Sequence, residues 1–474
     1  MQDAAYGSLL RGRRQSLHRR IAATLEERFP ETVAAQPARL AQHCQEAGLA
    51  EQAVMYWLKA GQQALAHSAM AEAVAQLRNG LAALGGLPDS PWRQQQELDL
   101  QVALGSALTA TKGFSAAEMV EPLARARALA EQLDRPEYLV PLLHNQAGLH
   151  LARGEYRRAM PLCQQLEQLG KARNDVTAQI LGCRYQGIAR FWLGELAAAR
   201  AVLERGVGLV GPAYHPIETV SVDPYPQMLG YLGVILVLQG HLDQARSRRN
   251  EAVTAARRFS HVHTLATVLG LAGWFDWLTD SPFEHAEELL ALVTEHRFQF
   301  WWGRALVYRG KSLLALGRAQ DAVALITQGL AKLHAAEAFL GMPVVLTWLA
   351  QAHAALGQMA EVEKCLAEAA KRVEASDERF VEAEVLHRVP GDLRKAAGDP
   401  SGAERHYQQA IAIAERQGAR LLQLRACTRL ARLWRDQGRR AEAHDLLASI
   451  YGWFTEGFDV PVLKEAKALL EELA

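Results

Sequence analysis

A glycine that recurs about every forty residues constrains this chain more than any other feature. The glycines in helix-breaking positions are Gly113, Gly154, Gly194, Gly240, Gly317, Gly357, Gly398 and Gly438. Most steps between them are 40 or 41 residues, and one is 46. The 77-residue gap after Gly240 holds one further unit, whose turn carries Ser281 in place of glycine. A period of this length indicates a repeat protein that grows in one dimension.

Small residues stand at fixed distances on both sides of these turns. Five positions after the turn residue the chain has Ala159, Ala199, Ala245, Ala286, Ala322, Ala403 and Ala443. Seven positions before it stand Ala147, Gly187, Gly233, Gly310, Ala350, Gly391 and Ala431. Glycine ends a helix by adopting a left-handed backbone, and small residues let two antiparallel helices approach closely. The pattern predicts an all-α chain of about nine or ten helix-turn-helix units stacked into an α-solenoid.

These offsets resemble the tetratricopeptide repeat, in which small residues also recur twelve positions after the turn. That position holds Gly206, Ala252, Gly329, Ala369 and Ala410, and Ala60 stands twelve positions after Gly48 in an earlier unit with the same spacing. The resemblance implies a right-handed superhelix whose concave groove is lined by the first helix of each unit. The period here exceeds the usual value of about 34 residues, so we expect longer helices.

Charge and cysteine content exclude several classes of protein. The 474 residues contain 52 lysines and arginines and 52 aspartates and glutamates, so no net field favours nucleic acid or an anionic membrane. The five cysteines are scattered and form no CxxC pair, which argues against disulfides and zinc. The N-terminus lacks a signal peptide, and the apolar run at 228–238 is too short for a bilayer. We therefore expect a cytoplasmic protein without metal or cofactor.

Composition predicts four segments along the chain. They are a helical segment with a first repeat-like unit at 1–84, a breaker-rich linker at 85–96, the repeat array at 97–450 and a C-terminal cap at 451–474. Within the array, the stretch at 211–227 contains four prolines. We expect an ordered loop there on one face of the solenoid, and long loops in compact arrays are often functional.

Four stretches carry a more specific resemblance. Residues 8–30, 47–65, 422–447 and 451–473 resemble the C-terminal repeat region of a bacterial multidomain family. Its members typically place a class III adenylate or guanylate cyclase domain, or another input domain, and a P-loop signal-transduction ATPase before the repeats. The chain contains no GxxxxGK[ST], HExxH or GxSxG string and no convincing strand runs. We expect it to correspond to the repeat region alone and to catalyse neither reaction.

One helix carries a basic face. Arg425, Arg429, Arg432 and Arg435 are spaced by four, three and three residues, which places them on one side of a helix. Earlier first helices carry Arg388 and Lys395, and Arg304 and Lys311. Arginines offer paired donors to carboxylates and phosphates, so these eight residues are the candidate partner-binding groove for a protein or an acidic peptide. The alternative is a solvated face that keeps an amphipathic helix soluble.

Other clusters are assigned structural roles. Arginines 11, 13, 14, 19 and 20 lack interleaved aromatic residues, so we do not expect nucleic-acid binding. The aromatic clusters at 273–278 and 298–308 are expected to fill core gaps. His215, His261 and His263 lack carboxylate or cysteine partners at metal-ligand spacing.

The stretch YGWFTEGFD at 451–459 fits a ligand-binding loop, a docking motif or the lid of a hydrophobic core. A solenoid's last unit has an apolar face without a neighbour. We expect Trp453, Phe454 and Phe458 to bury that face. Gly452 and Gly457 would bend the chain, and Asp459 would cap the closing helix, which has Pro461 in its first turn.

The combined interpretation is a non-catalytic repeat scaffold that mediates protein–protein interaction. Its partner would be a protein or an acidic peptide, and it would serve as the sensor or regulatory arm of a bacterial signalling ATPase or cyclase system. An alternative hypothesis is a small-molecule sensor with its ligand near 211–227. A third is an enzyme fragment that shares the label of its cyclase or ATPase relatives.

Overall fold

The computed structural model describes residues 11–66, 69–112, 117–211, 214–215, 217, 222–259, 262–296, 298–336 and 338–474. All regular elements in this part of the chain are helical, which confirms the predicted fold class. Spatial clustering divides the chain into two compact units, Met1–Leu149 and His150–Ala474. No described helix is both long enough and apolar enough to cross a membrane.

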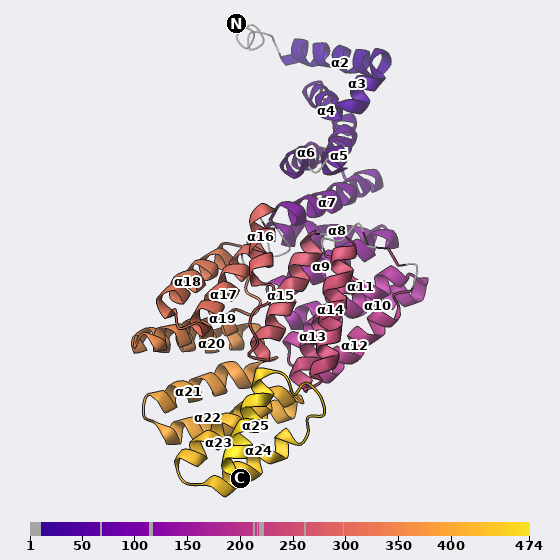
Figure 1. The fold of residues 1–474 in the computed structure, drawn as a ribbon. Coiled ribbons are helices and arrows are strands. Elements are labelled where there is room, and N and C mark those ends of the chain that lie inside the picture. The colour runs from indigo at the N-terminus through magenta and orange to yellow at the C-terminus, as the bar shows by residue number, and fades with distance from the viewer. Residues whose placement is uncertain are drawn as a thin grey trace. The chain divides into compact units, whose positions relative to one another are not determined.

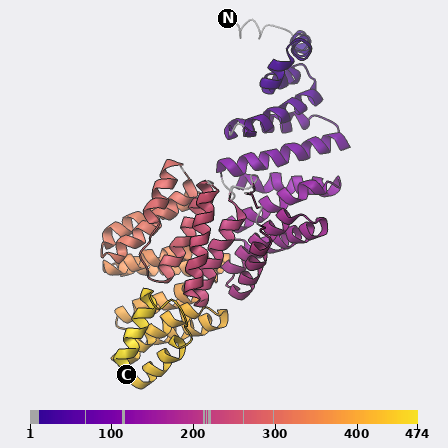
Figure 2. The ribbon, with the colours of Figure 1, turned by 45° about the vertical axis from the view of Figure 1, so that its right-hand side comes forward.

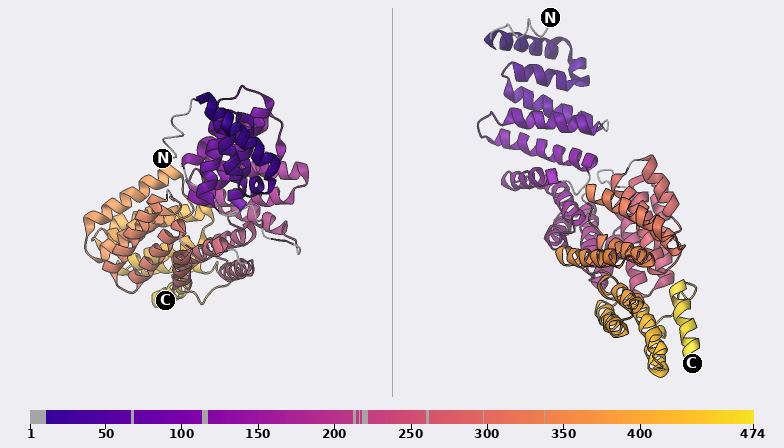
Figure 3. Two further views of the ribbon diagram at one scale, coloured as in Figure 1. Left: turned by 90° about the horizontal axis from the view of Figure 1, so that it is seen from above. Right: turned by 90° about the vertical axis from the view of Figure 1, so that its left-hand side faces the viewer.

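The first unit is a stack of helices that follow one another along the chain (Figures 1 and 3). Its elements are α2 (Arg11–Arg28), α3 (Pro30–Ala35), α4 (Pro37–Glu46), α5 (Ala50–Ala66), α6 (Met70–Leu84), α7 (Pro91–Lys112), η1 (Ala117–Met119), α8 (Val120–Gln132) and most of α9 (Pro136–Ala152). Leu40, Cys44 and Trp57 form one apolar core, and Leu77 and Leu98 belong to another. The stretch expected to be a linker is helical from α7 onward, so the break between α6 and α7 covers only residues 85–90.

The second unit contains the regular helix pairs (Figure 2). Its elements are α10 (Tyr156–Arg173), α11 (Val176–Trp192), α12 (Leu196–Gly208), α13 (Pro224–Gln239), α14 (Leu242–Arg258), α15 (Val262–Leu278), α16 (Ala286–Glu295), α17 (Gln299–Ala315), α18 (Ala319–Ala335), α19 (Met342–Ala355), α20 (Met359–Ser376), the π-helical η2 (Ala383–Arg388), α21 (Val389–Ala396), α22 (Pro400–Gln417), α23 (Arg420–Asp436), α24 (Arg440–Tyr451) and α25 (Pro461–Leu473). Odd-numbered helices from α11 to α23 are first helices of their pairs, and η2 continues directly into α21.

The repeat pattern predicted the pairs correctly. The turn glycines have positive φ angles, such as +79° at Gly194 and +89° at Gly240. A Cβ atom added at Gly187 would lie 2.4 Å from Leu203 on the following helix, which explains the small residue seven positions before the turn. Gly113 lies outside the described residues. After α15 the left-handed residue is Asp280, with φ of 54°, so the turn position assigned to Ser281 was one residue too late.

Turns of early pairs contact the beginnings of much later pairs in the second unit. The backbone N–H of Arg379 donates to the carbonyl oxygen of Trp192 at 2.7 Å. The Tyr156 hydroxyl donates to Glu378 at 2.9 Å across 222 residues. Phe380 then packs between first helices, with its ring centroid 4.8 Å from that of Trp192. The concave side, which we expected to be an open groove, is therefore filled here by buried side chains.

The C-terminal aromatic stretch fastens the end of the chain to the turn between α13 and α14. A Cβ atom at Gly240 would lie 2.6 Å from Trp453 and 2.9 Å from Phe454, so only glycine permits this approach. Phe454 is buried, whereas Trp453 and Phe458 are 38% and 47% exposed, so the prediction that all three are buried is wrong for two of them. Trp453 lies against His241 at the α13–α14 turn, with 5.6 Å between the ring centroids, and the Phe458 ring lies 6.0 Å from that of Tyr451.

The closing helix α25 covers the last pair through buried apolar residues, which include Val462, Leu463 and Ala466. Pro461 stands in its first turn as expected. Asp459 does not cap the helix, because Val460 occupies the N-cap position without a side-chain bond. The Asp459 carboxylate instead accepts from Arg246 at 2.9 Å.

Candidate functional site

A cavity of about 170 Å³ lies among the first helices of the second unit. Its lining comes from α15 and the turn after it, α17, α19, η2, α21 and α23. The lining residues are Trp277, Asp280, Lys311, Thr347, Trp348, Gln351, Glu384, Arg388, Val389, Asp392, Arg425 and Arg429. First helices therefore build the inner face, as the tetratricopeptide geometry implies, and this part of the face is polar and charged.

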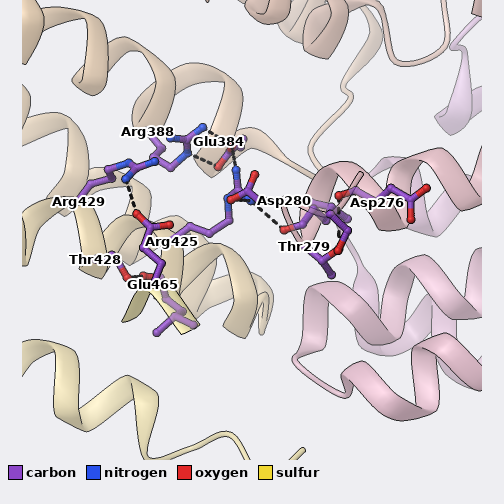
Figure 4. A network of polar contacts seen from close by, with 12 residues as sticks. Asp276, Thr279, Asp280, Glu384, Arg388, Arg425, Thr428, Arg429 and Glu465 are labelled. Carbon is purple, nitrogen blue, oxygen red and sulfur yellow. Dashed lines mark hydrogen bonds and ion pairs between the residues drawn. The ribbon is translucent and has the colours of Figure 1, made fainter. Parts of the chain in front are cut away.

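Arg425 joins two distant parts of the cavity wall (Figure 4). Its guanidinium donates to the carbonyl oxygen of Leu278 at 2.8 Å and pairs with Asp280 at 3.0 Å. A second nitrogen donates to Glu384 at 3.2 Å. The C-terminal end of a helix carries partial negative charge, so the last turn of α15 stabilises the Arg425 guanidinium.

Glu384 and Arg388 form the most buried ion pair of the cavity, with an oxygen–nitrogen distance of 2.5 Å. Burial by itself raises the pKa of Glu384, but the charges of Arg388 and Arg425 outweigh that effect and lower the pKa to about 2. Arg388 also contacts Asp392 at 2.5 Å. Both members of the pair lie on the π-helical segment η2, a distortion that is frequent at functional sites.

Lys311 is the one cavity cation that forms no ion pair with a carboxylate within the described residues. Its ammonium donates to the Gln351 side-chain oxygen at 2.9 Å and lies 5.9 Å from the centre of the Trp348 ring. Burial, together with the charges of Arg388 and Arg425, lowers the pKa of Lys311 to about 8, although Asp280 acts in the opposite direction.

The eight residues predicted for partner binding divide into two sets. Arg304, Arg388 and Arg425 are only 3%, 4% and 7% exposed, and Lys311 lines the cavity. We call these four the inner set. Arg425 is thus neither part of an open groove nor of a solvated face, because carboxylates and a helix end surround it.

The other four residues form the outer set, which is partly exposed and paired. Its members are Lys395, Arg429, Arg432 and Arg435, with side chains 37%, 30%, 34% and 28% exposed. Arg429 and Arg432 contact Glu465 of α25 at 2.8 and 2.6 Å. Arg435 contacts Glu472 at 2.9 Å, and Lys395 contacts Asp436 at 2.9 Å. The basic face predicted on α23 exists, and carboxylates of the same chain occupy it.

Arg304 lies away from the cavity, at a second buried polar cluster. It donates to the Leu340 carbonyl oxygen and lies 5.9 Å from the centre of the Trp274 ring. Glu378 is 4% exposed and accepts from the backbone N–H of Gly341 at 3.1 Å. Burial raises the pKa of Glu378 to about 7.

Sequence analysis missed the acidic and neutral residues of the cavity, among them Asp280, Glu384 and Gln351. The repeat period would have found two of them. Gln351 stands 40 residues after its partner Lys311, and Glu384 stands 41 residues before its partner Arg425. Residues one period apart lie on neighbouring first helices, so equivalent positions of successive repeats indicate which side chains meet.

Among the remaining candidates, the aromatic cluster at 273–278 has the structural role that we expected. Trp274, Phe275 and Trp277 are buried, as expected for the cluster at 273–278. No described group of three or more histidine, cysteine, aspartate or glutamate residues is placed to hold a metal ion. His261 and much of the 211–227 loop lie outside the described residues, and no described residue of that loop lines the cavity.

No family model matches this chain. The uncharacterized protein R02095 of Rhizobium meliloti (strain 1021) is 26% identical over 449 residues, which cover 90% of this chain and 42% of that protein. The chain thus spans less than half the length of this curated relative.

Among solved structures, the Rap protein complexed with Competence and Sporulation Factor matches with a TM-score of 0.54 and 12% identity, over 77% of this chain and 98% of that one. The fold is a tetratricopeptide-type helical solenoid.

Two other solved structures match with lower TM-scores. The signal transduction ATPase with a tetratricopeptide repeat sensor from Pyrococcus horikoshii has a TM-score of 0.39 at 14% identity and covers 80% of this chain and 54% of that one. Human IFIT1 has a TM-score of 0.41 at 13% identity, and the match covers 98% of this chain and 95% of IFIT1.

Proposed function

We propose that this chain is a non-catalytic repeat scaffold that binds another protein and acts as the regulatory arm of a bacterial signalling ATPase or cyclase system. The observation that carries the proposal is the solenoid itself, in which successive first helices present charged side chains on one face. Such arrays offer large surfaces built from independently variable positions. The Rap protein of the same fold was solved with Competence and Sporulation Factor bound, which supports a recognition role.

The outer set is the surface that an acidic partner can reach. Its ion pairs are partly exposed, and exposed pairs contribute only about 0–1 kcal/mol each. A partner that supplies carboxylates can therefore exchange with Glu465 and Glu472 at small cost, whereas the inner set is enclosed. In this proposal the partner contacts Lys395, Arg429, Arg432 and Arg435.

The signalling role rests on the resemblance of four stretches, at 8–30, 47–65, 422–447 and 451–473, to repeat regions that accompany cyclase and ATPase modules. In this proposal the partner is a cytoplasmic protein that carries such a module. The repeat array supplies recognition, and the partner supplies nucleotide chemistry.

Affinity capture with the full chain tests this function. We expect the chain to recover a P-loop ATPase or cyclase protein, and the complex to re-form from purified components. Arg432→Glu with Arg435→Glu should weaken binding at least tenfold, while Arg318→Glu with Lys364→Glu, which reverses two exposed charges elsewhere, should not. Recovery of no such protein contradicts the proposed function, and equal binding by both double variants contradicts the assigned surface.

A further inference from the structure

Four cations and three carboxylates line the cavity, and one cation, Lys311, contacts no carboxylate among the described residues. The cations are Lys311, Arg388, Arg425 and Arg429, and the carboxylates are Asp280, Glu384 and Asp392. Each arginine contacts at least one carboxylate, at distances between 2.5 and 3.5 Å. Lys311 contacts only the neutral Gln351 among the described residues, so two of its three N–H donors remain available.

Two further buried donors, on residues that line the cavity, lack acceptors. The indole N–H of Trp348 has no hydrogen-bond partner among the described residues, although the side chain is 1% exposed. The Nε–H of Arg425 has none either, and that residue is 7% exposed. Buried donors are normally paired, and leaving one unpaired costs about 1–3 kcal/mol. The spare donors of the Lys311 ammonium and these unpaired N–H groups can each take an acceptor that the described residues do not supply.

We propose that this cavity is a binding site for one carboxylate group of a small acid or of a peptide side chain, held by Lys311 and the indole N–H of Trp348. Lys311 and Trp348 lie outside the outer set, although Arg429 of that set also lines the cavity. The inference therefore goes beyond the proposed protein-binding function. A carboxylate brings one negative charge and two acceptor oxygens. The single unpaired cation matches that charge, whereas a phosphate dianion would remain half compensated beside three carboxylates.

The size of the cavity agrees with this ligand. About 170 Å³ is far more than the roughly 10–15 Å³ that one water molecule needs on the same measure. The space accommodates a carboxylate with a short carbon chain. The surface of the cavity is mostly polar, and Asp280 and Asp392 can accept hydrogen bonds from an amino group on that chain.

Binding should be accompanied by proton uptake. An anion beside Lys311 favours its charged form, opposing the burial and the Arg388 and Arg425 charges that lower its pKa. Asp280 and Glu384 face the same ammonium and already favour the charged form. At a pH near 8 a fraction of the Lys311 side chains is neutral before binding, and the carboxylate complex should be protonated.

Isothermal titration and thermal unfolding of the full chain test the site. The probes are acetate, succinate, L-glutamate, inorganic phosphate and a blocked tripeptide with one internal glutamate, all at constant ionic strength. We expect at least one carboxylate to raise the Tm, because only ligands of the native state do so, and phosphate to have less effect. The free acids and the blocked peptide distinguish the two sources of the carboxylate. Stabilisation by none of the carboxylates overturns the proposal.

The matched variants are Lys311→Met in the cavity and Lys364→Met, which removes an exposed lysine paired with Glu361 on α20. Lys311→Met should lose at least tenfold in carboxylate affinity and Lys364→Met less than twofold. Equal affinity in both overturns the proposal. Trp348→Phe keeps an aromatic side chain but removes the N–H. It should weaken binding several-fold, so it provides a second test should Lys311→Met not fold.

Proton uptake gives a readout that a merely structural Lys311 would not produce. Titrations at pH 8 in two buffers of different ionisation enthalpy should show net proton uptake with the unmodified protein and none with Lys311→Met. Absence of uptake in the unmodified protein contradicts carboxylate binding at this ammonium.

Discussion

The guanidinium of Arg425 donates a 2.8 Å hydrogen bond to the carbonyl oxygen of Leu278, 147 residues earlier in the chain. This bond connects α23 with the C-terminal end of α15. It shows that first helices several pairs apart meet inside the second unit. A residue expected to face an open groove is therefore part of the interior that closes the array.

Replacing Arg425 should destabilise the second unit strongly. Arg425→Met leaves the Leu278 carbonyl without its side-chain donor and removes a cation from Glu384 and Asp280. Removal of one partner from a buried ion pair costs about 3–5 kcal/mol. Chemical unfolding followed by circular dichroism measures the effect as a lower midpoint.

The control for this prediction is Arg432→Met on the same helix. Arg432 is partly exposed and pairs with Glu465, so its removal should cost no more than about 1 kcal/mol. Equal midpoints for the two variants would show that Arg425 is not buried as described.

Gly240 provides a second prediction, about the C-terminal stretch. Gly240→Ala places a methyl group 2.6 Å from Trp453, whereas Gly317→Ala meets nothing within 4 Å. Both glycines have positive φ angles, so both substitutions carry the same backbone cost of about 1 kcal/mol. Only Gly240→Ala should also loosen residues 451–474.

Hydrogen exchange followed by mass spectrometry separates the two glycine variants. We expect faster exchange in α25 for Gly240→Ala and for Trp453→Ala, and native exchange there for Gly317→Ala. Unchanged exchange in all three would mean that the aromatic stretch does not fasten the chain end to the α13–α14 turn.

The buried carboxyl group of Glu378 predicts a pH dependence. Burial raises its pKa from 4.5 to about 7, despite hydrogen bonds from Tyr156 and Gly341 and the charges of Arg304 and Arg372. A group whose pKa is raised on folding stabilises the native state below its unfolded pKa, and that stability is lost as the pH rises through the folded pKa. The free energy of unfolding should therefore fall as the pH rises from about 4.5 to about 7.

Glu378→Gln removes this titration. The gap between the two pKa values corresponds to about 3 kcal/mol in total. Part of this loss occurs below pH 5, so the unmodified protein should lose about 2.5 kcal/mol relative to the variant between pH 5 and pH 8. Glu361→Gln, at an exposed residue, is the control and should show no such trend. Unfolding midpoints measured between pH 5 and pH 8 check the direction of this change in stability. A difference between the unmodified protein and Glu378→Gln that stays constant with pH would refute it.

The sequence predicted the local repeat well, because each turn glycine and its small neighbours act within one helix pair. Gly187 against Leu203 is such a contact, 16 residues apart. Tyr156 against Glu378 is not, because the curvature that brings them together accumulates from small rotations over many pairs. No single pair encodes that curvature, so the closed interior was missed.

The surroundings of the basic face on α23 could not be predicted from its sequence pattern either. Arginines spaced by three and four residues give the same pattern whether solvent or carboxylates surround them. Only the comparison of Arg425 with Glu384, one repeat earlier, distinguishes the two cases. The outer arginines were predicted on the correct face, but their pairing with Glu465 depends on where α25 lies.

Closure of the second unit is most directly tested by cross-linking Arg157→Cys to Asp377→Cys with a short bismaleimide. These two side chains contact each other at 2.6 Å across 220 residues. The five native cysteines are buried, and burial raises the pKa of Cys163 and of Cys427 to about 12, so they should not compete. We predict rapid intramolecular cross-linking of this pair in the native protein and none for Arg318→Cys with Asp377→Cys. Absence of the cross-link in the folded double variant, or equal yields for both pairs, would contradict the closed array.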